Sequence, residues 1–179
     1  MTKQELEFVI KEYGKDIYSF CKYLTTSLPE ADDLYQDTFL LAVELKEKID
    51  YGNNPKSYLL SIALRIWKNK KRKFAWRKRI AEVQSLVDEK DVDMEVSPEL
   101  SPEEHIIYKE EEEAVRLAVN SLPDKLKLVV LLFYMEELPV AQIAEVMKIP
   151  TGTVLSRLHQ ARKVLRKELE GVIDGKRVG

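Results

Sequence analysis

Residues 138–169, LPVAQIAEVMKIPTGTVLSRLHQARKVLRKEL, contain the most informative pattern in the chain. The stretch predicts two helices joined by a tight turn. The first helix is expected from Pro139 to Met147, because proline suits a first helical position, where its missing N–H has no partner anyway. Residues 148–150 (KIP) end it, since the residue before a proline is disfavoured in the α region. Thr151 then offers a hydroxyl cap for the second helix.

The second helix of this stretch has an apolar face and a polar face. Apolar residues at spacings of four, three and four are expected to point inward; they are Val154, Leu158, Ala161 and Leu165. The outward face carries Leu155, Ser156, His159, Gln160 and Lys163, with Arg157 and Arg162 nearby. A short helix, a turn and a longer helix with an exposed polar face form the helix-turn-helix arrangement, whose second helix enters the DNA major groove. An ordinary helical hairpin with a solvated basic face fits the same pattern.

Composition favours a helical protein of one ordinary domain or two small ones. The chain has 179 residues, of which 45% are apolar and 34% charged. Its single cysteine, Cys21, excludes an intrachain disulfide and lies on an apolar helical face, which predicts a buried thiol. We find no run of eighteen apolar residues and no signal-peptide pattern, so a cytoplasmic location is expected.

The net charge of −2 conceals a strong separation of charge along the chain. Residues 64–80 carry nine basic side chains and no acidic one, and residues 148–179 carry eight basic and three acidic ones. Between them, residues 82–113 carry two basic and thirteen acidic side chains. A polyanion is therefore expected to bind at the two basic blocks and to be repelled by the middle.

Three helices are predicted in the first 80 residues, at about 4–26, 30–49 and 55–79, with a loop at 50–55. Acidic and amide side chains crowd the first turns of the second helix; they are Asp32, Asp33, Gln36 and Asp37. Such residues favour the positive end of the helix dipole. A docking surface for a partner is the alternative explanation.

The second half of the third helix mixes aromatic rings with the nine cations of the basic block. Cations suit phosphates and exposed rings suit unpaired bases, so nucleic acid is the expected ligand, with a solvated basic face as the alternative. At 100° per residue Trp67 and Phe74 share a face, and Trp76 lies away from it. Trp67 also lies near the apolar side, where a core position fits equally well. Asn53 and Asn54 in the preceding loop suit a flipped base edge.

Residues 85–104 are acidic and contain two Ser-Pro pairs, a composition typical of a linker without a core. Further helices are expected at about 102–120 and 123–135, before the helix-turn-helix. The sequence therefore predicts an all-α fold of two small helical domains joined by an acidic flexible linker. The predicted boundaries are 1–80 for the first domain, 81–104 for the linker and 105–179 for the second domain, which contains the helix-turn-helix.

Three groups of residues follow in a fixed order: ADDLYQDTFL at 31–40, NPKSYLLSIA at 54–63, and LP, IAE and GTVLSRLHQAR at 122–123, 143–145 and 152–162. Together they resemble the bacterial sigma factors of the extracytoplasmic-function (ECF) class, which are promoter-recognition subunits of RNA polymerase. Residues 31–40 resemble the polymerase-binding helix of that family. Residues 54–63 (NPKSYLLSIA), with the basic helix that follows, resemble its reader of the minus-ten promoter element. Residues 122–123 (LP), 143–145 (IAE) and 152–162 (GTVLSRLHQAR) resemble its reader of the minus-thirty-five element. The resemblance extends over almost the whole chain.

The resemblance implies three sets of site residues. The set implied to bind the polymerase is Asp33, Leu34, Gln36, Asp37 and Phe39. The set implied to bind minus-ten DNA is Tyr51, Asn53, Asn54, Arg65, Trp67, Asn69, Lys70, Arg72 and Lys73. The set implied to bind minus-thirty-five DNA is Thr153, Leu155, Ser156, Arg157, His159, Gln160, Arg162 and Lys163.

The partners implied are core RNA polymerase, promoter DNA and an anti-sigma factor. The chain is expected to have no membrane segment of its own, to use no metal or other cofactor and to perform no chemistry itself. It departs from the family pattern at four positions. The family often has Trp where Tyr58 stands and Asn where Arg65 stands, and it usually has a basic residue where Leu155 stands and often Arg where Gln160 stands. Leu155 and Gln160 lie on the outward face of the second helix, so the resemblance does not determine which bases this chain reads.

Two other classes of protein share some of these features. A stand-alone helix-turn-helix regulator requires a receiver or ligand domain, whereas the first 80 residues have all-helical patterns. A small nuclease requires clustered acids for a metal, whereas the acids here lie on the linker or at helix starts. Binding to core polymerase and a metal-dependent cleavage assay separate these alternatives from a sigma factor.

Overall fold

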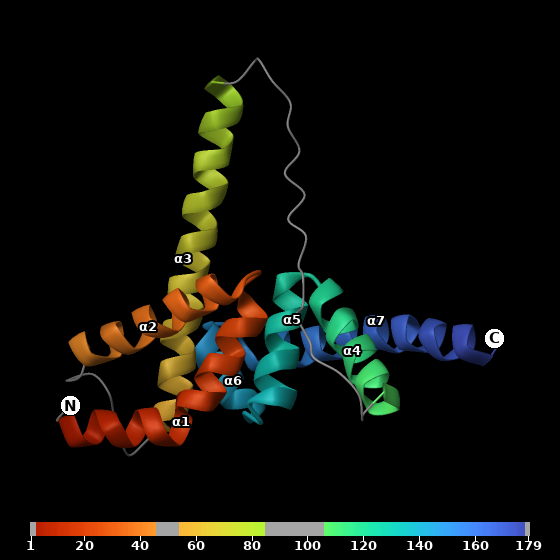
Figure 1. Ribbon diagram of the computed structural model, residues 1–179, viewed down its shortest axis with the longest axis horizontal. Coiled ribbons are helices and arrows are strands. Elements are labelled where there is room, and N and C mark those ends of the chain that lie inside the picture. Colours follow the sequence, from red (N-terminus) through yellow and green to blue (C-terminus); the bar gives the residue numbers. More distant parts are fainter. Residues whose placement is uncertain (1–2, 46–53, 85–105, 178–179) are drawn as a thin grey trace. The chain divides into compact units, whose positions relative to one another are not determined.

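The computed structural model describes residues 3–45, 54–84 and 106–177, and all regular structure in these residues is helical (Figure 1). The chain divides into two compact units, Met1–Pro98 and Glu99–Gly179. The all-α prediction is therefore confirmed for the described residues. None of the described helices is long and apolar enough to cross a membrane.

The first unit consists of helices α1 (Lys3–Leu24), α2 (Leu28–Glu44) and α3 (Pro55–Gln84), each of which packs against the other two. Their apolar faces meet in one core, whose largest fully buried side chains are Ile17, Phe20, Leu34, Leu59, Leu60 and Leu64. Gly14 allows α1 to approach α2 closely, since a Cβ atom there would lie 3.0 Å from the Tyr35 hydroxyl. Cys21 is buried in this core, as predicted.

The start of α2 is fixed by hydrogen bonds from its own sequence. Ser27 caps the helix by accepting a hydrogen bond from the Glu30 N–H at 3.4 Å. Glu30 in turn accepts hydrogen bonds from the N–H and the hydroxyl of Thr26, at 3.1 and 3.0 Å. The helix begins at Leu28, slightly before the predicted start at residue 30. The predicted end near residue 49 lies outside the described residues.

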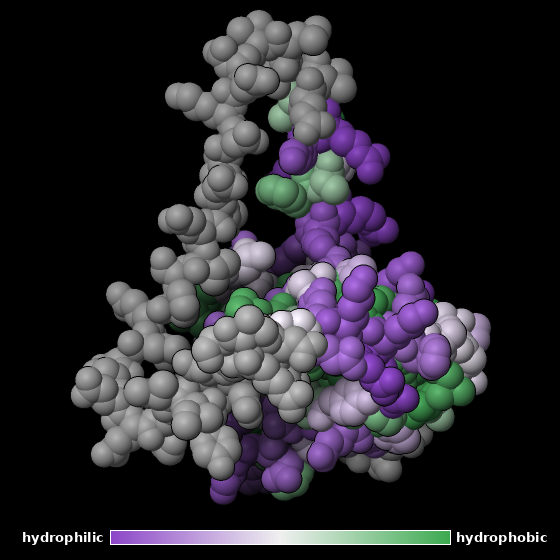
Figure 2. All heavy atoms as spheres, turned by 90° about the vertical axis from the view of Figure 1, so that its right-hand side faces the viewer, coloured by the Kyte–Doolittle hydropathy of each residue, from purple (hydrophilic) through white to green (hydrophobic). Residues whose placement is uncertain are grey.

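Helix α3 begins at a cap made by Asn54. The side-chain oxygen of Asn54 accepts a hydrogen bond from the Ser57 N–H at 3.2 Å, and the backbone of Asn54 has a φ of 66°. The first half of α3 packs on α1 and α2, while every described side chain from Lys68 to Ala81 is exposed. The helix continues to Gln84, beyond the predicted end at residue 79. Its second half projects past α1 and α2 (Figure 1) and is mostly hydrophilic with isolated hydrophobic side chains (Figure 2).

One apolar residue of α1 is more exposed than its spacing suggests. Ile10 lies two turns before the buried Ile17, but 40% of its surface is exposed. At 100° per residue Ile10 lies only about 20° around the helix from Ile17, which is fully buried, so its exposure does not come from facing away from the core. The described side chains before Val9 are also exposed, so the first turns of α1 are less covered than the rest of the helix.

The described residues of the second unit, 106–177, form five consecutive helical segments. They are α4 (Ile106–Ser121), α5 (Asp124–Val130), the π-helix η2 (Leu131–Met135), α6 (Val140–Met147) and α7 (Thr151–Arg177). The core between them contains Leu126, Val129, Leu132, Ile143, Val154 and Leu158. A helix over 123–135 was predicted, and the π-helical last turn is the feature that the pattern did not indicate.

The turn between α6 and α7 has two determinants. Lys148 ends α6 in the left-handed conformation, with a φ of 55°, and the Ile149 N–H donates to the Ala144 carbonyl at 3.0 Å. The Pro150 carbonyl accepts the N–H groups of Thr153 and Val154, which starts α7. Helix α7 already includes residue 151, so the predicted cap lies inside the first turn and Pro150 precedes it.

Candidate nucleic-acid and partner interfaces

The outward face of α7 is placed as the sequence predicted. Val154, Leu158 and Ala161 are buried against the unit, and Leu165 is half-buried. The side chains exposed to solvent are Leu155, Ser156, His159, Gln160, Arg162 and Lys163, while Thr153 and Arg157 are half-buried. The predicted inward and outward faces of α7 are therefore confirmed, and the DNA-binding roles of these residues stay predictions.

Two side chains on this helix are held by local hydrogen bonds. The Ser156 hydroxyl donates to the Thr153 carbonyl at 3.1 Å. Arg162 donates from Nε to the Tyr134 hydroxyl at 2.7 Å, and its guanidinium lies over the rings of Phe133 and Tyr134. The π-helical turn η2 thus positions Arg162, which uses one of the five N–H groups of its guanidinium in this contact. The sequence indicated a role for Arg162 but not its contacts with Phe133 and Tyr134.

The exposed half of α3 has two different basic faces. Lys70 and Trp67 lie on the side toward α2: Lys70 forms an ion pair of 2.7 Å with Asp37, and Trp67 is half-buried with the Lys71 ammonium 4.9 Å from its ring centre. On another side, Arg72 donates to the Asn69 side-chain oxygen at 3.0 Å, and both residues are exposed. The predicted minus-ten set is therefore divided between two faces of one helix.

The remaining residues of that set have different surroundings. Arg65 and Lys73 are exposed on α3. Asn54 is half-buried, and its side chain caps α3. Tyr51 and Asn53 lie outside the described residues. An alanine at position 54 would remove a helix cap as well as any contact with a base.

The predicted polymerase-binding set of α2 separates into core and surface residues. Leu34 is 1% exposed and Phe39 is 8% exposed, so both side chains belong to the core of the first unit. Asp33 and Gln36 are exposed, and Asp37 is half-exposed in its ion pair with Lys70. The structure therefore limits the surface of this set to its polar members.

Two apolar residues extend the polar surface of α2, and the sequence analysis missed both of them. Leu40 is 64% exposed, and Val43 is also exposed. Together with Asp33 and Gln36 they follow the spacing 33, 36, 40 and 43, which places them on one face of a helix. This spacing in the sequence could have grouped Leu40 and Val43 with the polar residues before the structure was known. An exposed apolar pair beside polar groups is typical of a protein-binding surface.

The acid Asp32 has a structural partner on α1. The Tyr18 hydroxyl donates to Asp32 Oδ1 at 2.8 Å, and this hydrogen bond raises the pKa of the Tyr18 hydroxyl above its ordinary value, because the phenolate would lose it. The ring of Tyr18 contacts Tyr35 edge-on, and Tyr35 contacts Phe39 in turn. Asp32 therefore joins α2 to α1, which explains one of the crowded acids without an external partner.

Each of the two helical units thus exposes basic side chains on one long helix, α3 in the first and α7 in the second, as expected for a protein that binds nucleic acid. No three His, Cys, Asp or Glu side chains gather as metal ligands within the part of the chain that the structure describes. Residues 9–78 match the family model "Sigma-70 region 2", and residues 112–165 match "Sigma-70, region 4". The two matches together span more than half of the chain. The chain belongs to the sigma-70 family, in its ECF class, whose members direct RNA polymerase in transcription initiation.

Curated relatives match most of the chain. The ECF RNA polymerase sigma factor SigW of Bacillus subtilis is 27% identical over 165 residues, covering 90% of this chain and 87% of the relative. The RNA polymerase sigma factor YlaC of the same organism is 25% identical, with 93% of each protein covered. The RNA polymerase sigma-H factor of Pseudomonas aeruginosa is 36% identical over 73 residues, which cover 41% of this chain and 38% of the relative.

Two solved structures have a similar fold. The sigma factor RpoE in complex with the anti-sigma factor NepR, from Bartonella quintana, has a TM-score of 0.67 and 23% identity, covering 94% of this chain and 96% of that one. CnrH in complex with the cytosolic domain of CnrY has a TM-score of 0.65 and 16% identity, covering 95% and 90%.

Proposed function

We propose that this sigma factor binds core RNA polymerase through the solvent face of α2. The surface consists of Asp33, Gln36 and Asp37 together with the exposed Leu40 and Val43. The apolar side chains at one end of this surface would supply buried area, and the polar side chains at the other end would supply orientation. Leu34 and Phe39 act indirectly in this proposal, since they fix α2 on the core of the unit.

The second part of the proposal assigns the minus-thirty-five element to α7. One observation carries it: the second helix of a helix-turn-helix has an exposed polar face, and Val154, Leu158 and Ala161 on its opposite face are buried. Ser156, His159 and Gln160 would contact base edges, and Leu155 suits the methyl group of thymine. Arg162 and Lys163 would bind phosphates, which position the helix without reading sequence.

The third part assigns the minus-ten element to α3 and to the loop before it. The basic side chains of α3 would hold the backbone of the separated strand, and Asn54 with Asn53 and Tyr51 would contact a flipped base. The functional parts proposed are 1–80 for polymerase and minus-ten binding, 81–104 for the acidic linker and 105–179 for minus-thirty-five binding. In this role the protein acts in the cytoplasm and catalyses no reaction itself.

An anti-sigma factor is the proposed regulatory partner. The solved complex of RpoE with the anti-sigma factor NepR supports it, because the sigma factor there has the same fold as this chain. That likeness concerns the fold, so the identity of the partner rests on binding experiments with this chain.

Run-off transcription with core RNA polymerase on a pool of genomic promoter fragments tests the function. Transcripts are expected only when both the chain and core polymerase are present, and their start sites are expected to share two upstream elements. Specific DNA binding without any stimulation of core polymerase would instead identify a stand-alone regulator.

The same assay tests the division of labour on α7. Gln160→Ala is expected to change which minus-thirty-five sequence gives the most transcript, with about 1–3 kcal/mol for each lost base contact. Lys163→Ala is the matched control on the same exposed face, and it is expected to lower transcription from all promoters alike and to flatten the salt dependence. A uniform loss from Gln160→Ala would remove this residue from the base-reading set.

A further inference from the structure

The exposed half of α3 continues one of its two faces beyond the residues assigned so far. Arg65, Asn69 and Arg72 follow the spacing i, i+4, i+7 along the helix, and Trp76 occupies the next position, i+11. The four side chains therefore form a single line, about 16 Å long at 1.5 Å per residue. All four are exposed, and the Trp76 side chain has 64% of its surface in solvent.

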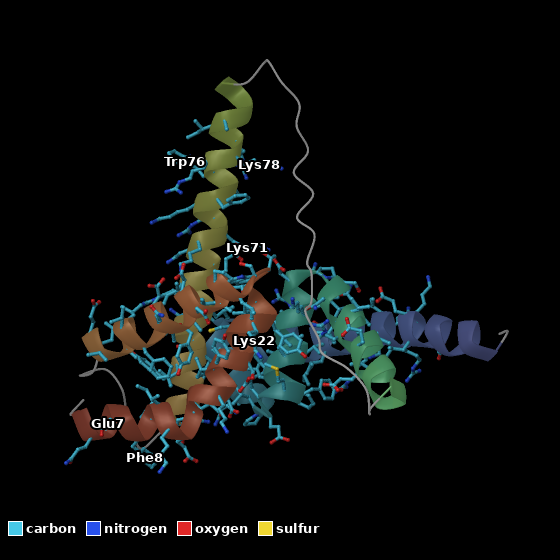
Figure 3. The ribbon with its side chains drawn as sticks, in the orientation of Figure 1. Glu7, Phe8, Lys22, Lys71, Trp76 and Lys78 are labelled. Carbon is cyan, nitrogen blue, oxygen red and sulfur yellow. The ribbon has the colours of Figure 1, made fainter. Side chains whose placement is uncertain are left out.

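The other exposed ring of this half, Phe74, belongs to the opposite face. Phe74 lies two turns after Trp67 and close to the direction of Lys71 and Lys78. Figure 3 shows Lys71 and Lys78 leaving α3 on one side and Trp76 on the other. The face that carries Phe74 contacts α2 at its start, through the Lys70–Asp37 ion pair. On the face that carries Trp76, the side chains from Arg65 to Trp76 are all exposed to solvent.

The charge around Trp76 indicates which ligand would cover the ring. From Pro55 to Ala81 the helix contains no acidic residue, and Arg72, Lys73 and Arg79 lie within about one turn of the ring. A large exposed aromatic surface among cations fits a ligand with a negative backbone and flat apolar groups. Single-stranded nucleic acid has this chemistry, whereas the bases of a duplex are stacked on one another and offer no free face.

We propose that Trp76 stacks on an unpaired base of a single nucleic-acid strand whose phosphates lie along Arg65 and Arg72. The site extends the proposed minus-ten surface of α3 and therefore rests on that proposed function. Stacking is tolerant of sequence because every base has a flat face, so Trp76 holds the separated strand without choosing it. Phe74, which is 71% exposed, does not take part because it faces away from this line.

Tryptophan fluorescence reports this contact directly. The chain contains two tryptophans, so Trp67→Phe leaves Trp76 as the single emitter. Titration of this variant with oligodeoxythymidine at low salt is expected to quench the emission as the strand binds. A duplex of the same length is expected to bind through phosphates and to leave the emission nearly unchanged. Saturating binding of the single strand without a change in emission would overturn the proposal.

Matched variants in the unaltered background separate stacking from charge. Trp76→Leu is expected to weaken binding of the single strand by about 5- to 150-fold, the equivalent of one stacked base, and to leave duplex binding within about twofold. Trp76→Phe keeps a ring and is expected to restore most of the affinity. Phe74→Leu removes an equally exposed ring from the opposite face of the same helix and is expected to change neither affinity. Circular dichroism confirms that each variant keeps its helical content.

Three results would contradict the assignment. If Trp76→Leu lowers the affinity for single strand and duplex equally, the ring supports the basic surface in general and does not stack on a base. Equal effects of Phe74→Leu would refute the choice of face. If Trp76→Leu leaves the affinity for the single strand unchanged, Trp76 does not contact the strand, and its exposed ring would then bind another partner, such as an acidic protein. Core polymerase is absent from these measurements, so their failure is distinct from failure of transcription in the run-off assay.

Discussion

At the scale of single residues, the turn of the helix-turn-helix contains a backbone conformation that its side chain does not favour. Lys148 has a φ of 55° at the end of α6. The left-handed conformation costs a residue with a Cβ atom about 1–2 kcal/mol, whereas glycine adopts it readily. The sequence signalled the end of the helix through Pro150 but not this conformation, because neither glycine nor asparagine stands there.

Lys148→Gly is therefore expected to stabilise the second unit by about 0.5–1 kcal/mol. Glycine removes the backbone strain of the folded state, and the greater conformational entropy of glycine in the unfolded state offsets part of this gain. Urea unfolding followed by circular dichroism measures the change. Lys148→Ala is the control, since it removes the same charge and keeps the Cβ atom, and no gain is expected from it. An equal gain from alanine would assign the effect to charge rather than to the backbone.

At the scale of helices, one ion pair joins a proposed polymerase contact to a proposed DNA contact. Asp37 on α2 and Lys70 on α3 lie 2.7 Å apart, and both side chains are about half exposed. An exposed pair contributes at most about 1 kcal/mol to folding. The carboxylate also offsets the charge that Lys70 presents to a phosphate, so polymerase binding at Asp37 would leave Lys70 more available to DNA.

Asp37→Asn is expected to raise the affinity of the free chain for duplex DNA by up to about fivefold at low salt. The gain is expected to vanish when Lys70→Gln is also present, because no cation is then left to release. Glu44→Gln is the matched control, an exposed acid two turns further along the same face of α2. Fluorescence anisotropy with a labelled duplex gives all three affinities. A gain of the same size from Glu44→Gln would show a general charge effect.

At the scale of the whole molecule, basic and acidic segments alternate along the chain. The acidic block of residues 82–113 lies between the two basic sites in sequence, and most of it falls outside the described residues. Its charge alone predicts that the free chain binds DNA weakly despite two basic surfaces, because like charges repel a polyanion at low salt. Such weakness would favour promoter binding by the complex with polymerase over binding by the free factor.

Neutralising five acids of this block, Asp88, Glu89, Asp91, Asp93 and Glu95, to their amides removes five negative charges from a chain of net charge −2. The variant is expected to bind non-specific duplex DNA several-fold more tightly at low salt, with most of the gain lost at high salt through screening. Anisotropy titrations at both salt concentrations measure it. A gain that persists at high salt would point to a contact other than long-range charge.

Much of this fold follows from the spacing of apolar residues, as α7 illustrates. Its buried and exposed faces were predicted because a period of 3.6 residues fixes which side chains share a face. The sequence does not fix how much of a face a neighbouring helix covers. For this reason Leu34 was included in the polymerase-binding set, although its side chain is buried in the core.

The contacts between helices in the candidate sites could not be predicted from sequence patterns. The Asp37–Lys70 pair and the support of Arg162 by Tyr134 join residues 33 and 28 positions apart, respectively. Neither pairing leaves a periodic signal. A helical wheel alone places Trp76 in line with Arg65. The structure added that the side chains of this line are exposed, whereas Lys70 on the other face pairs with Asp37 of α2.

The cap of α3 restricts which amino acids position 54 can accept. Its backbone is left-handed, and its side-chain oxygen holds the Ser57 N–H. Glycine would accept the backbone and lose the cap, and aspartate would keep the cap but bring a negative charge toward DNA. Asparagine alone combines a tolerated backbone, a capping oxygen and an uncharged amide. Under the proposed function, Asn54 would therefore be among the least replaceable positions of the chain, for reasons of folding and of recognition together.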